Sequence, residues 1–483
     1  MVLVCRKALT RRPYQEAPFE KQENTGMANA MGTIGKSGRI FGVLTSVAVL
    51  FCGLRAGPAE AESVHAKATV DFLDSIGVVS TFEDRGQPYD KTLAMLRYGG
   101  FRWLRGGIEG LSDTGPLTMK SFLNLHSQAG VKISWGLGSG ISDVERLVAT
   151  GRILAKAGAL LAFEGNNEPN NWPVTYRGEK GGGRSSWLPL AKLHADLYRA
   201  VKTDPDLSSY PVWSLSEPGA QTDNAGLQFL TIPEGADTLM RAGTRFADYA
   251  NVHNYLYHPN VPDPADNKTW DAADPSSATS VDGLYGNFGR TWANRFEGYS
   301  EDALVNLPRV TTETGVAIKG KVDEALQGVN LVNLYLSQFV RGYRHTAVYI
   351  LRDRTDEEGV QTYGFFAPDY TPRLGARYLH NLTTILADTD RREVLDRLDY
   401  SITPKPGTVH DLLLQHSGGT FQLVIWGELL VGSHRLTVRL DKMAKRVELY
   451  DVTTSSAPAS SFEEVSSIEL EVSDHPLILE IEF

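Results

Sequence analysis

Two glutamates in this chain of 483 residues each stand where a short apolar run ends. The run at 159–163 leads into the triplet Asn167-Glu168-Pro169, and the run at 307–312 ends at Glu313. Strands of a parallel barrel deliver side chains to an active-site face in this way. Cleavage of a glycosidic bond needs two carboxylates, one as acid/base and one as nucleophile or base. The acid needs a raised pKa, which burial and a nearby carboxylate can supply.

The elements that must position these glutamates follow from the periodicity between residues 66 and 388. Short apolar runs alternate there with segments of helical spacing, which is typical of parallel βα units. The predicted strands cover residues 76–80, 101–105, 131–135, 159–163, 211–216, 249–255, 309–312 and 347–351. Eight such units predict an α/β fold with a (β/α)8 TIM barrel. The alternative, an open doubly wound sheet, gives no reason for the two glutamates to converge.

The pattern changes after a closing helix at 379–386. Six short alternating runs without long helical segments predict a small all-β sandwich domain. These runs are 411–415, 421–426, 435–440, 446–450, 468–472 and 477–481. We therefore divide the chain into residues 1–61, a signal peptide with an upstream extension, 62–389, the catalytic barrel, and 390–483, the sandwich.

The amino terminus has the features of an export signal. Lys36 and Arg39 precede an apolar stretch at 40–54, and Ala59-Glu60-Ala61 gives the small-x-small cleavage pattern. This predicts a secreted or periplasmic protein cleaved near Ala61, with no stable membrane insertion after signal removal. A membrane anchor is the alternative. Both cysteines precede the cleavage site, so the mature chain would hold no disulfide or thiolate site.

Composition limits the partners and cofactors. The formal net charge of -10 disfavours nucleic acid and leaves a glycan as the expected partner. The sequence contains no HExxH, P-loop or Gly-x-Ser-x-Gly motif, and we expect no cofactor and no metal. The Asp-rich stretch at 263–274 could bind calcium, although a solvated loop is the more ordinary interpretation.

The triplet after the fourth predicted strand and Glu313 after the seventh resemble clan A retaining glycoside hydrolases. The sandwich after the barrel adds a likeness to family 39, the xylosidase-like enzymes, and to cellulase-like relatives, over residues 70–480. The resemblance implies that Glu168 is the acid/base and Glu313 the nucleophile of a double displacement. It also implies that Asn167 contacts the 2-hydroxyl of the substrate.

Further positions extend the resemblance. His253 and Tyr255, in the sixth predicted strand, match residues that steady the nucleophile or a sugar hydroxyl, although His253 as a core residue is equally expected. Arg105 resembles the second-strand arginine that pairs with the nucleophile, and such a cation would keep Glu313 ionised. A surface arginine is the alternative there.

The eighth strand departs from the clan, in which a tryptophan commonly forms the floor of the sugar site. This chain has Tyr349-Ile350-Leu351-Arg352 instead. Either Arg352 contacts substrate, or stacking comes from Trp135, Trp172 or Trp187. Two other carboxylates compete for roles in the cleft: Glu164 as the acid, and Glu217 after the fifth strand.

Together these features predict a secreted retaining β-glycosidase that hydrolyses O-glycosidic bonds. Long loops at 170–186 and 258–300 favour a polysaccharide or oligosaccharide substrate. The alternatives are a non-catalytic carbohydrate-binding protein on a glycosidase-like barrel, and a structural protein of the envelope or matrix.

Overall fold

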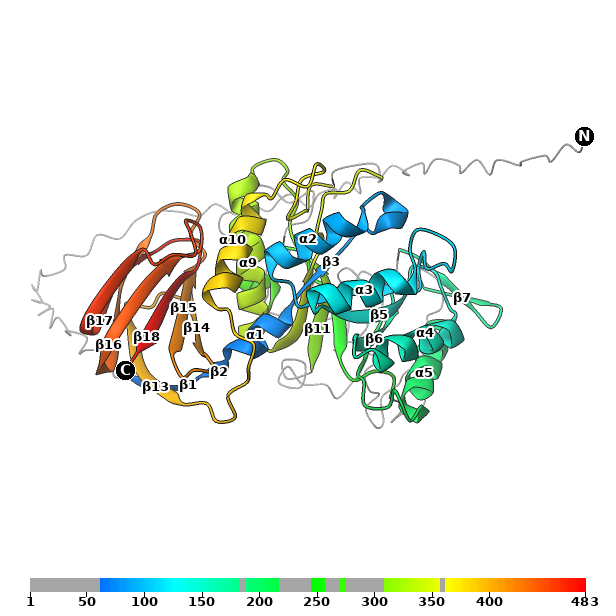
Figure 1. Cartoon of the computed structure of the whole chain (residues 1–483), viewed down its shortest axis with the longest axis horizontal. Helices are drawn as coiled ribbons and strands as arrows, with labels where there is room; N and C mark the ends of the chain where they lie inside the picture. Colours follow the sequence, from blue (N-terminus) through cyan, green and yellow to red (C-terminus); the bar gives the residue numbers. More distant parts are fainter. Residues whose placement is uncertain are drawn as a thin grey trace, which may run out of the picture. The chain divides into compact units, whose positions relative to one another are not determined.

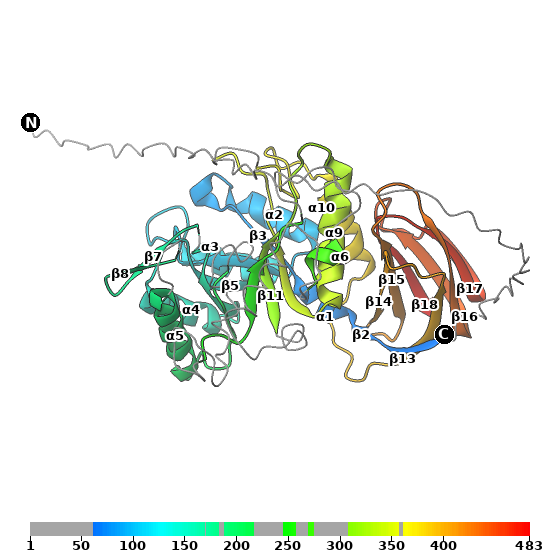
Figure 2. The same cartoon turned by 180° about the vertical axis from the view of Figure 1, so that it is seen from behind.

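The computed structural model describes residues 61–169, 171–182, 188–216, 245–256, 269–274, 308–356 and 361–483. The predicted signal peptide up to residue 60, Trp187, Glu217 and residues 263–268 of the Asp-rich stretch lie outside these residues. Figures 1 and 2 show the chain from two opposite sides. No helix in the described part of the chain has the length and apolar character that a bilayer crossing requires.

The central element is a parallel sheet whose strands follow the order β10-β11-β12-β3-β4-β5-β6-β9. The strands are β3 (Ile76–Val79), β4 (Trp103–Gly107), β5 (Lys132–Gly138), β6 (Leu160–Asn166), β9 (Val212–Trp213), β10 (Ala250–His253), β11 (Arg309–Thr314) and β12 (Tyr343–Val348). A parallel bridge between Trp213 and Tyr249 joins the two ends, with the Ser214 amide donating to the Tyr249 carbonyl at 2.9 Å. All eight predicted strands are present, and the predicted barrel is confirmed.

Helices surround these strands (Figure 1). They are α1 (Thr69–Ser75), η1 (Glu83–Arg85), α2 (Tyr89–Gly99), α3 (Met119–Ala129), α4 (Val144–Lys156), α5 (Leu188–Thr203), α6 (Thr269–Ala272), α9 (Glu324–Val340) and α10 (Leu374–Ile385). Thr118, Asp143 and Asp323 cap the amino termini of α3, α4 and α9 by accepting a hydrogen bond from a first-turn amide. A small hairpin, β7 (Val174–Tyr176) and β8 (Glu179–Gly181), follows β6.

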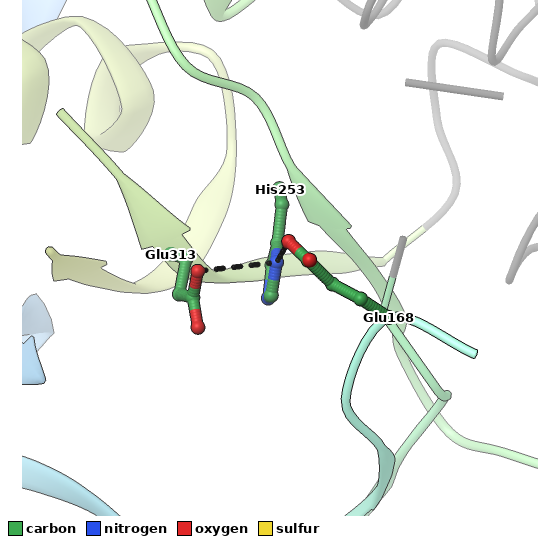
Figure 3. Close-up of side chains that lie close together, drawn as sticks. All are labelled: Glu168, His253 and Glu313. Carbon is green, nitrogen blue, oxygen red and sulfur yellow. Dashed lines mark hydrogen bonds and ion pairs between the residues drawn. The ribbon is translucent and has the colours of Figure 1, made fainter. Parts of the chain in front are cut away.

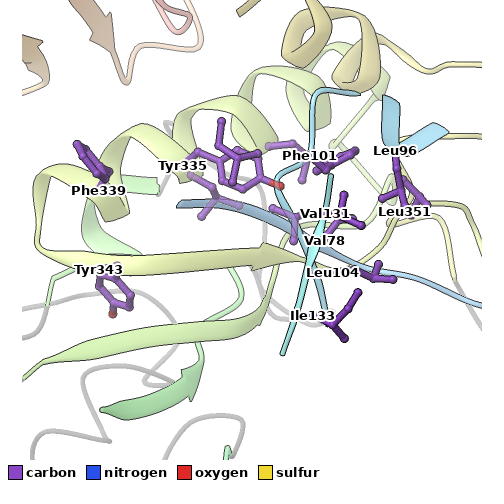
Figure 4. Close-up of a cluster of buried hydrophobic side chains, with 14 of the residues drawn as sticks. Val78, Leu96, Phe101, Leu104, Val131, Ile133, Tyr335, Phe339, Tyr343 and Leu351 are labelled. Atoms are coloured by element: carbon purple, nitrogen blue, oxygen red, sulfur yellow. The ribbon is translucent and has the colours of Figure 1, made fainter. Parts of the chain in front are cut away.

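The apolar core lies between the strands and their helices. Figure 4 shows part of it, including Val78 and Leu104 on strands and Tyr335 and Phe339 on α9. These strand residues point outward, so the alternate residues of the same strands point toward the barrel axis.

The inward-facing residues form layers. A buried apolar layer fills the barrel near the strands' amino ends, made of Trp103, Ala162, Trp213, Val310 and Ala347. The Trp103 and Trp213 rings meet edge to face at 5.6 Å. Gly77 is required beside them, because a Cβ there would lie 2.0 Å from the Trp103 ring. Counting two residues further along β4, β6 and β11 gives Arg105, Glu164 and Thr312, so the next layer toward the carboxyl ends is polar.

The carboxyl-terminal domain is a separate, mostly antiparallel sheet with the order β1-β13-β16-β18-β15-β14-β2, and β17 pairs with β16. Its strands are β1 (Glu62–His65), β2 (Lys67–Ala68), β13 (Arg397–Thr403), β14 (Val409–Gln415), β15 (Phe421–Gly427), β16 (His434–Asp451), β17 (Ser460–Val472) and β18 (Leu477–Glu482). The all-β domain after the barrel is confirmed, with its own apolar core.

Two details of this domain differ from the predicted strands. The runs at 435–440 and 446–450 belong to one strand, β16, whose pairing register with β17 shifts between Arg439 and Ala444. The segment 62–68, assigned to the barrel by sequence, instead adds β1 beside β13 and β2 beside β14. Strands of 4 and 2 residues are too short to show a periodic pattern.

Candidate active site

The Arg105 guanidinium on β4 is the centre of the polar layer. Its Nη2 donates to Glu164 Oε1 at 2.6 Å and to Asn167 Oδ1 at 2.9 Å. Its Nη1 donates to Glu313 Oε1 at 2.5 Å. Burial alone would lower the pKa of Arg105, but the charges of Glu164 and Glu313 outweigh it and raise that pKa. Arg105 is therefore a fixed cation that links the strand of one glutamate to the strand of the other.

Glu313, on β11, is held from a second side by β10 and the residues after it. The Tyr255 hydroxyl donates to Glu313 Oε2 at 2.8 Å, and His253 Nδ1 lies 3.5 Å from the same oxygen. Burial, followed by the charges of Glu313 and Glu168, raises the Tyr255 pKa well above its ordinary value. Tyr255 is thus a permanent hydrogen-bond donor that orients the carboxylate.

Glu168 follows β6 and faces Glu313 across His253 (Figure 3). His253 Nδ1 lies 2.7 Å from Glu168 Oε1, and Asn171 Nδ2 donates to Glu168 Oε2 at 3.0 Å. The Glu168 backbone has φ of 40°, in the left-handed region that non-glycine residues seldom occupy and that is enriched at functional sites.

The protonation of Glu168 differs from the sequence-based expectation. Burial on its own raises the Glu168 pKa, but the hydrogen bond and charge of His253, together with the Asn171 amide, hold that pKa below its usual range. A raised pKa was expected for the acid. The contacts of Glu168 with His253 and Asn171 therefore favour the ionised form of this carboxyl group.

Below these groups lies a buried set of hydrogen bonds that the sequence analysis did not identify. Thr312 Oγ1 donates to Glu164 Oε1 at 2.9 Å and lies 3.1 Å from His253 Nε2. Asn251 Nδ2 lies 3.3 Å from Glu164 Oε1 and 3.0 Å from Thr312 Oγ1. Strand parity is the signal that could have found them, since Asn251 is two residues before His253 on β10.

The structure brings six of the predicted site residues together around the two glutamates' carboxyl groups: Arg105, Asn167, Glu168, His253, Tyr255 and Glu313. Glu164, the predicted competitor for the acid role, is 1% exposed and paired with Arg105, so it is buried beneath the carboxyl groups of Glu168 and Glu313. Trp172 keeps 55% of its surface exposed, and its amide donates to the Glu168 carbonyl at 2.8 Å. It therefore lies at the exposed edge of the site, next to Glu168.

Two predicted substrate contacts need correction. Trp135 points away from the barrel axis: it is fully buried, contacts Phe122 of α3, and donates to Thr150 Oγ1 of α4 at 2.8 Å. Strand alternation is the reason, because its neighbours on β5 take the inward positions. Arg352 is 4% exposed, donates to the Pro368 carbonyl at 3.0 Å, and lies over the Tyr370 ring, so it supports a loop.

The eighth strand instead supplies tyrosine. The rings of Tyr255, Tyr349 and Tyr363 lie 5.6 to 6.4 Å from one another, edge to face. Tyr349 OH donates to Gln361 Oε1 at 3.2 Å, and burial followed by the charge of Glu313 raises the Tyr363 pKa. Because Tyr255 binds Glu313, this cluster lies on the Glu313 side of the site.

Among the residues that the structure describes, Glu168, His253 and Glu313 also form a candidate cation site. Each offers a ligand atom, and these atoms lie within 4.8 Å of one another. One imidazole and two carboxylates suit zinc or a similar ion. Arg105 is already bound to Glu313 and opposes a second cation there. The expectation that no metal is needed stays a prediction.

Comparison with known proteins shows the fold class. No protein-family model and no curated protein matches the chain. Among solved structures, a family 39 glycoside hydrolase from the gut symbiont Bacteroides cellulosilyticus WH2 is 16% identical, with 86% of this chain and 83% of that chain covered and a TM-score of 0.53. A glucosidase from Croceicoccus marinus is 12% identical, covering 87% of this chain and 97% of that chain, with a TM-score of 0.53.

A third similar structure is CelM2, a bifunctional glucanase-xylanase from a metagenome library. It is 11% identical, covering 87% of this chain and 97% of that chain, with a TM-score of 0.53. The chain therefore has the two-domain fold found in clan A glycoside hydrolases, and the resemblance inferred from the sequence is confirmed at the level of fold. These identities are too low to carry over a substrate.

Proposed function

We propose that this protein is a retaining β-glycosidase in which Glu168 is the acid/base and Glu313 the nucleophile. The observation that supports this most directly is the spacing of the two glutamates: a carboxylate oxygen of Glu168 lies within 4.8 Å of a carboxylate oxygen of Glu313. Retaining enzymes hold their carboxyl groups about 5 to 5.5 Å apart, whereas inverting enzymes leave about 6.5 to 9.5 Å for a water. The contacts of each glutamate also differ in the way that two roles require.

Glu313 is bound as a carboxylate by Arg105 and by the Tyr255 hydroxyl. In the first step it attacks the anomeric carbon while Glu168 protonates the departing oxygen, and the glycosidic C–O bond breaks. A glycosyl ester of Glu313 results. Glu168, now a carboxylate, takes a proton from water, which attacks the same carbon and releases the sugar with its configuration retained.

The proposed substrate is a polysaccharide or an oligosaccharide, and the proposed location is outside the cytoplasm. An exposed indole beside the acid/base, Trp172, provides a flat apolar surface on which a sugar ring can stack. The similar structures include a glucanase-xylanase, so glucans and xylans are the first polymers to test. We expect a glycan and no nucleic acid as partner, and no stable membrane insertion once the signal is removed.

A panel of polysaccharides and aryl glycosides with wild type, Glu168→Ala and Glu313→Ala tests the proposal. We expect Glu168→Ala to lose about 10²- to 10⁴-fold on polysaccharide and less on dinitrophenyl glycosides, whose leaving group needs no proton. Glu313→Ala should be inactive on both. Glu179→Ala, an exposed substitution on the β7–β8 hairpin, is the control.

The anomeric configuration of the first product, followed by NMR, tests retention. An inverted product would refute the proposed mechanism even if both variants were inactive. Polysaccharide binding by wild type without any hydrolysis would instead support the non-catalytic carbohydrate-binding protein. Release of sugar that persists in Glu313→Ala would remove that residue from the nucleophile's role.

A further inference from the structure

His253 is a buried side chain that connects Glu168 and Glu313. Its ring is fully buried, and both nitrogens face polar partners. Nδ1 lies 2.7 Å from Glu168 Oε1 and 3.5 Å from Glu313 Oε2, while Nε2 lies 3.1 Å from Thr312 Oγ1. With the ring shielded from water, these neighbours decide which nitrogen carries a proton.

The hydroxyl of Thr312 has a single proton and three acceptors within reach. These are Glu164 Oε1 at 2.9 Å, Asn251 Oδ1 at 3.1 Å and His253 Nε2 at 3.1 Å. Glu164 is the nearest, and as the ion-pair partner of Arg105 it is a charged acceptor, which makes the stronger hydrogen bond. The Asn251 oxygen already accepts from the Thr312 amide at 3.2 Å.

Thr312 therefore donates to Glu164, and its oxygen is left to accept a hydrogen bond from His253. An imidazole nitrogen that donates must carry a proton. The Glu164 carboxylate can only accept hydrogen bonds, so it fixes the direction of this series of hydrogen bonds at its buried end. At the other end of the series, His253 Nε2–H donates to Thr312 Oγ1.

We propose that Glu164 and Thr312 are positioning residues that keep a proton on His253 Nε2. His253 Nδ1 and Glu168 then share one further proton. This shared proton is the one delivered to the leaving oxygen. The inference rests on the proposed function and extends it. The acid of the first step is then the pair of His253 and Glu168, so a single carboxyl group with a raised pKa is not needed.

The proton balance of the cycle follows. In the free enzyme the shared proton lies in the 2.7 Å contact between His253 Nδ1 and Glu168 Oε1. During glycosylation it passes to Glu168 and then to the glycosidic oxygen as the C–O bond breaks, leaving a neutral imidazole. During hydrolysis Glu168 removes a proton from water, and that proton returns to Nδ1.

Charged groups lie near both nitrogens of the His253 ring. Glu168 and Glu313 face Nδ1, from the end of β6 and from β11, and Glu164 acts on Nε2 through Thr312. Arg105 is the opposing cation, but it is already paired with Glu164 and Glu313. Loss of the Thr312 acceptor would leave a buried Nε2–H without a hydrogen-bond partner and so weaken the hold of the ring on that proton.

The test compares Thr312→Val, which keeps the shape but removes the hydroxyl, with Thr312→Ser, which restores it. The readout is the basic limb of the pH profile of kcat/KM, which reports loss of the acid's proton in the free enzyme. We expect the limb to move down by about one pH unit in Thr312→Val and to stay at the wild-type position in Thr312→Ser. A basic limb unchanged in the valine variant, or moved equally in both variants, would overturn the proposal.

A second readout is independent of activity. Imidazole ¹⁵N NMR of the histidine-labelled protein, with His253 assigned from the resonances lost in His253→Gln, should show a protonated Nε2 at neutral pH in wild type. In Thr312→Val the Nε2 proton should be lost at lower pH, while Thr312→Ser behaves as wild type. A bare Nε2 in wild type would refute the relay. If no glycan is hydrolysed the proposed function fails, and the NMR result still decides where the protons lie.

Discussion

His475 gives the sharpest prediction about the stability of this fold. It lies between β17 and β18, where Nδ1 is 2.9 Å from Asp474 Oδ1 and Nε2 is 3.6 Å from Asp451 Oδ1. The same loops reach the barrel's helices, since Asn333 of α9 donates to the Asp474 carbonyl and Asn381 of α10 to the Val452 carbonyl. A charged His475 therefore holds the point where the two domains meet.

The size of the effect follows from the pKa. Burial on its own lowers the His475 pKa, but hydrogen bonds to Asp451 and Asp474 and their charges raise it from 6.5 to about 9. Each unit corresponds to about 1.4 kcal/mol, so the protonated ring contributes at most about 3 kcal/mol to folding. Because the folded-state pKa is the higher one, this contribution is complete below pH 6.5 and is lost as the pH rises through about 9.

The assay is chemical unfolding of wild type and His475→Gln between pH 6 and pH 10. We expect the wild-type protein to be the more stable by up to about 3 kcal/mol at pH 6, and the difference to shrink toward zero at pH 10. Taking the difference between the two proteins removes the other groups that titrate in this range. A difference that does not depend on pH would refute the argument, because a purely steric role of the ring has no such dependence.

Three further predictions concern the barrel and the cleft. Gly77→Ala places a Cβ 2.0 Å from the Trp103 ring, so it should lower the free energy of unfolding by about 1 to 3 kcal/mol in a denaturation assay. The control is Gly407→Ala, whose Cβ meets no atom within 4 Å. It should change the free energy of unfolding little. Arg105→Lys keeps the positive charge but loses the forked guanidinium that joins two carboxylates, so kcat/KM should fall by about 100-fold or more. The circular dichroism spectrum should not change. Near-wild-type activity would contradict the role of Arg105 in holding the two carboxylates. Trp172→Ala should raise KM for oligosaccharides about tenfold, as expected for a lost stacking contact of about 1 to 2 kcal/mol. Hydrolysis of aryl glycosides should be unchanged. Equal losses on both kinds of substrate would contradict a role of the indole in stacking against a sugar ring.

The eight barrel strands and both glutamates could be predicted because their signals are local. Each strand is a short apolar run between helical segments; Glu313 lies at the end of such a run, and Glu168 lies two residues after β6. The β1 and β2 strands could not be found in this way, since their partners, β13 and β14, lie more than 300 residues away. Only the folded chain shows that residues 62–68 begin in the carboxyl-terminal sheet.

The candidate site was predicted less completely, for a geometric reason. Residue type and clan resemblance identified Arg105 and Tyr255, but the inward or outward direction of each side chain depends on strand parity. Applied to β5, parity would have excluded Trp135, because Gly136 is the residue whose Cβ position faces Glu164 on β6. Tyr363 follows a loop and has no periodic relation to Tyr349, so no pattern connects them in the sequence.

The layered barrel interior explains how a dense set of charges is tolerated in this protein. The apolar layer around Trp103 and Trp213 closes one end of the barrel, so the polar layer above it is shielded from water on that side. Buried charges are costly unless they are paired and hydrogen-bonded. Arg105 meets this condition by joining Glu164 below to Glu313 above. Glu164 therefore offsets part of the Arg105 charge. Removal of the Glu164 carboxylate would leave Arg105 paired with Glu313 alone, and it would also release Thr312 from its fixed orientation.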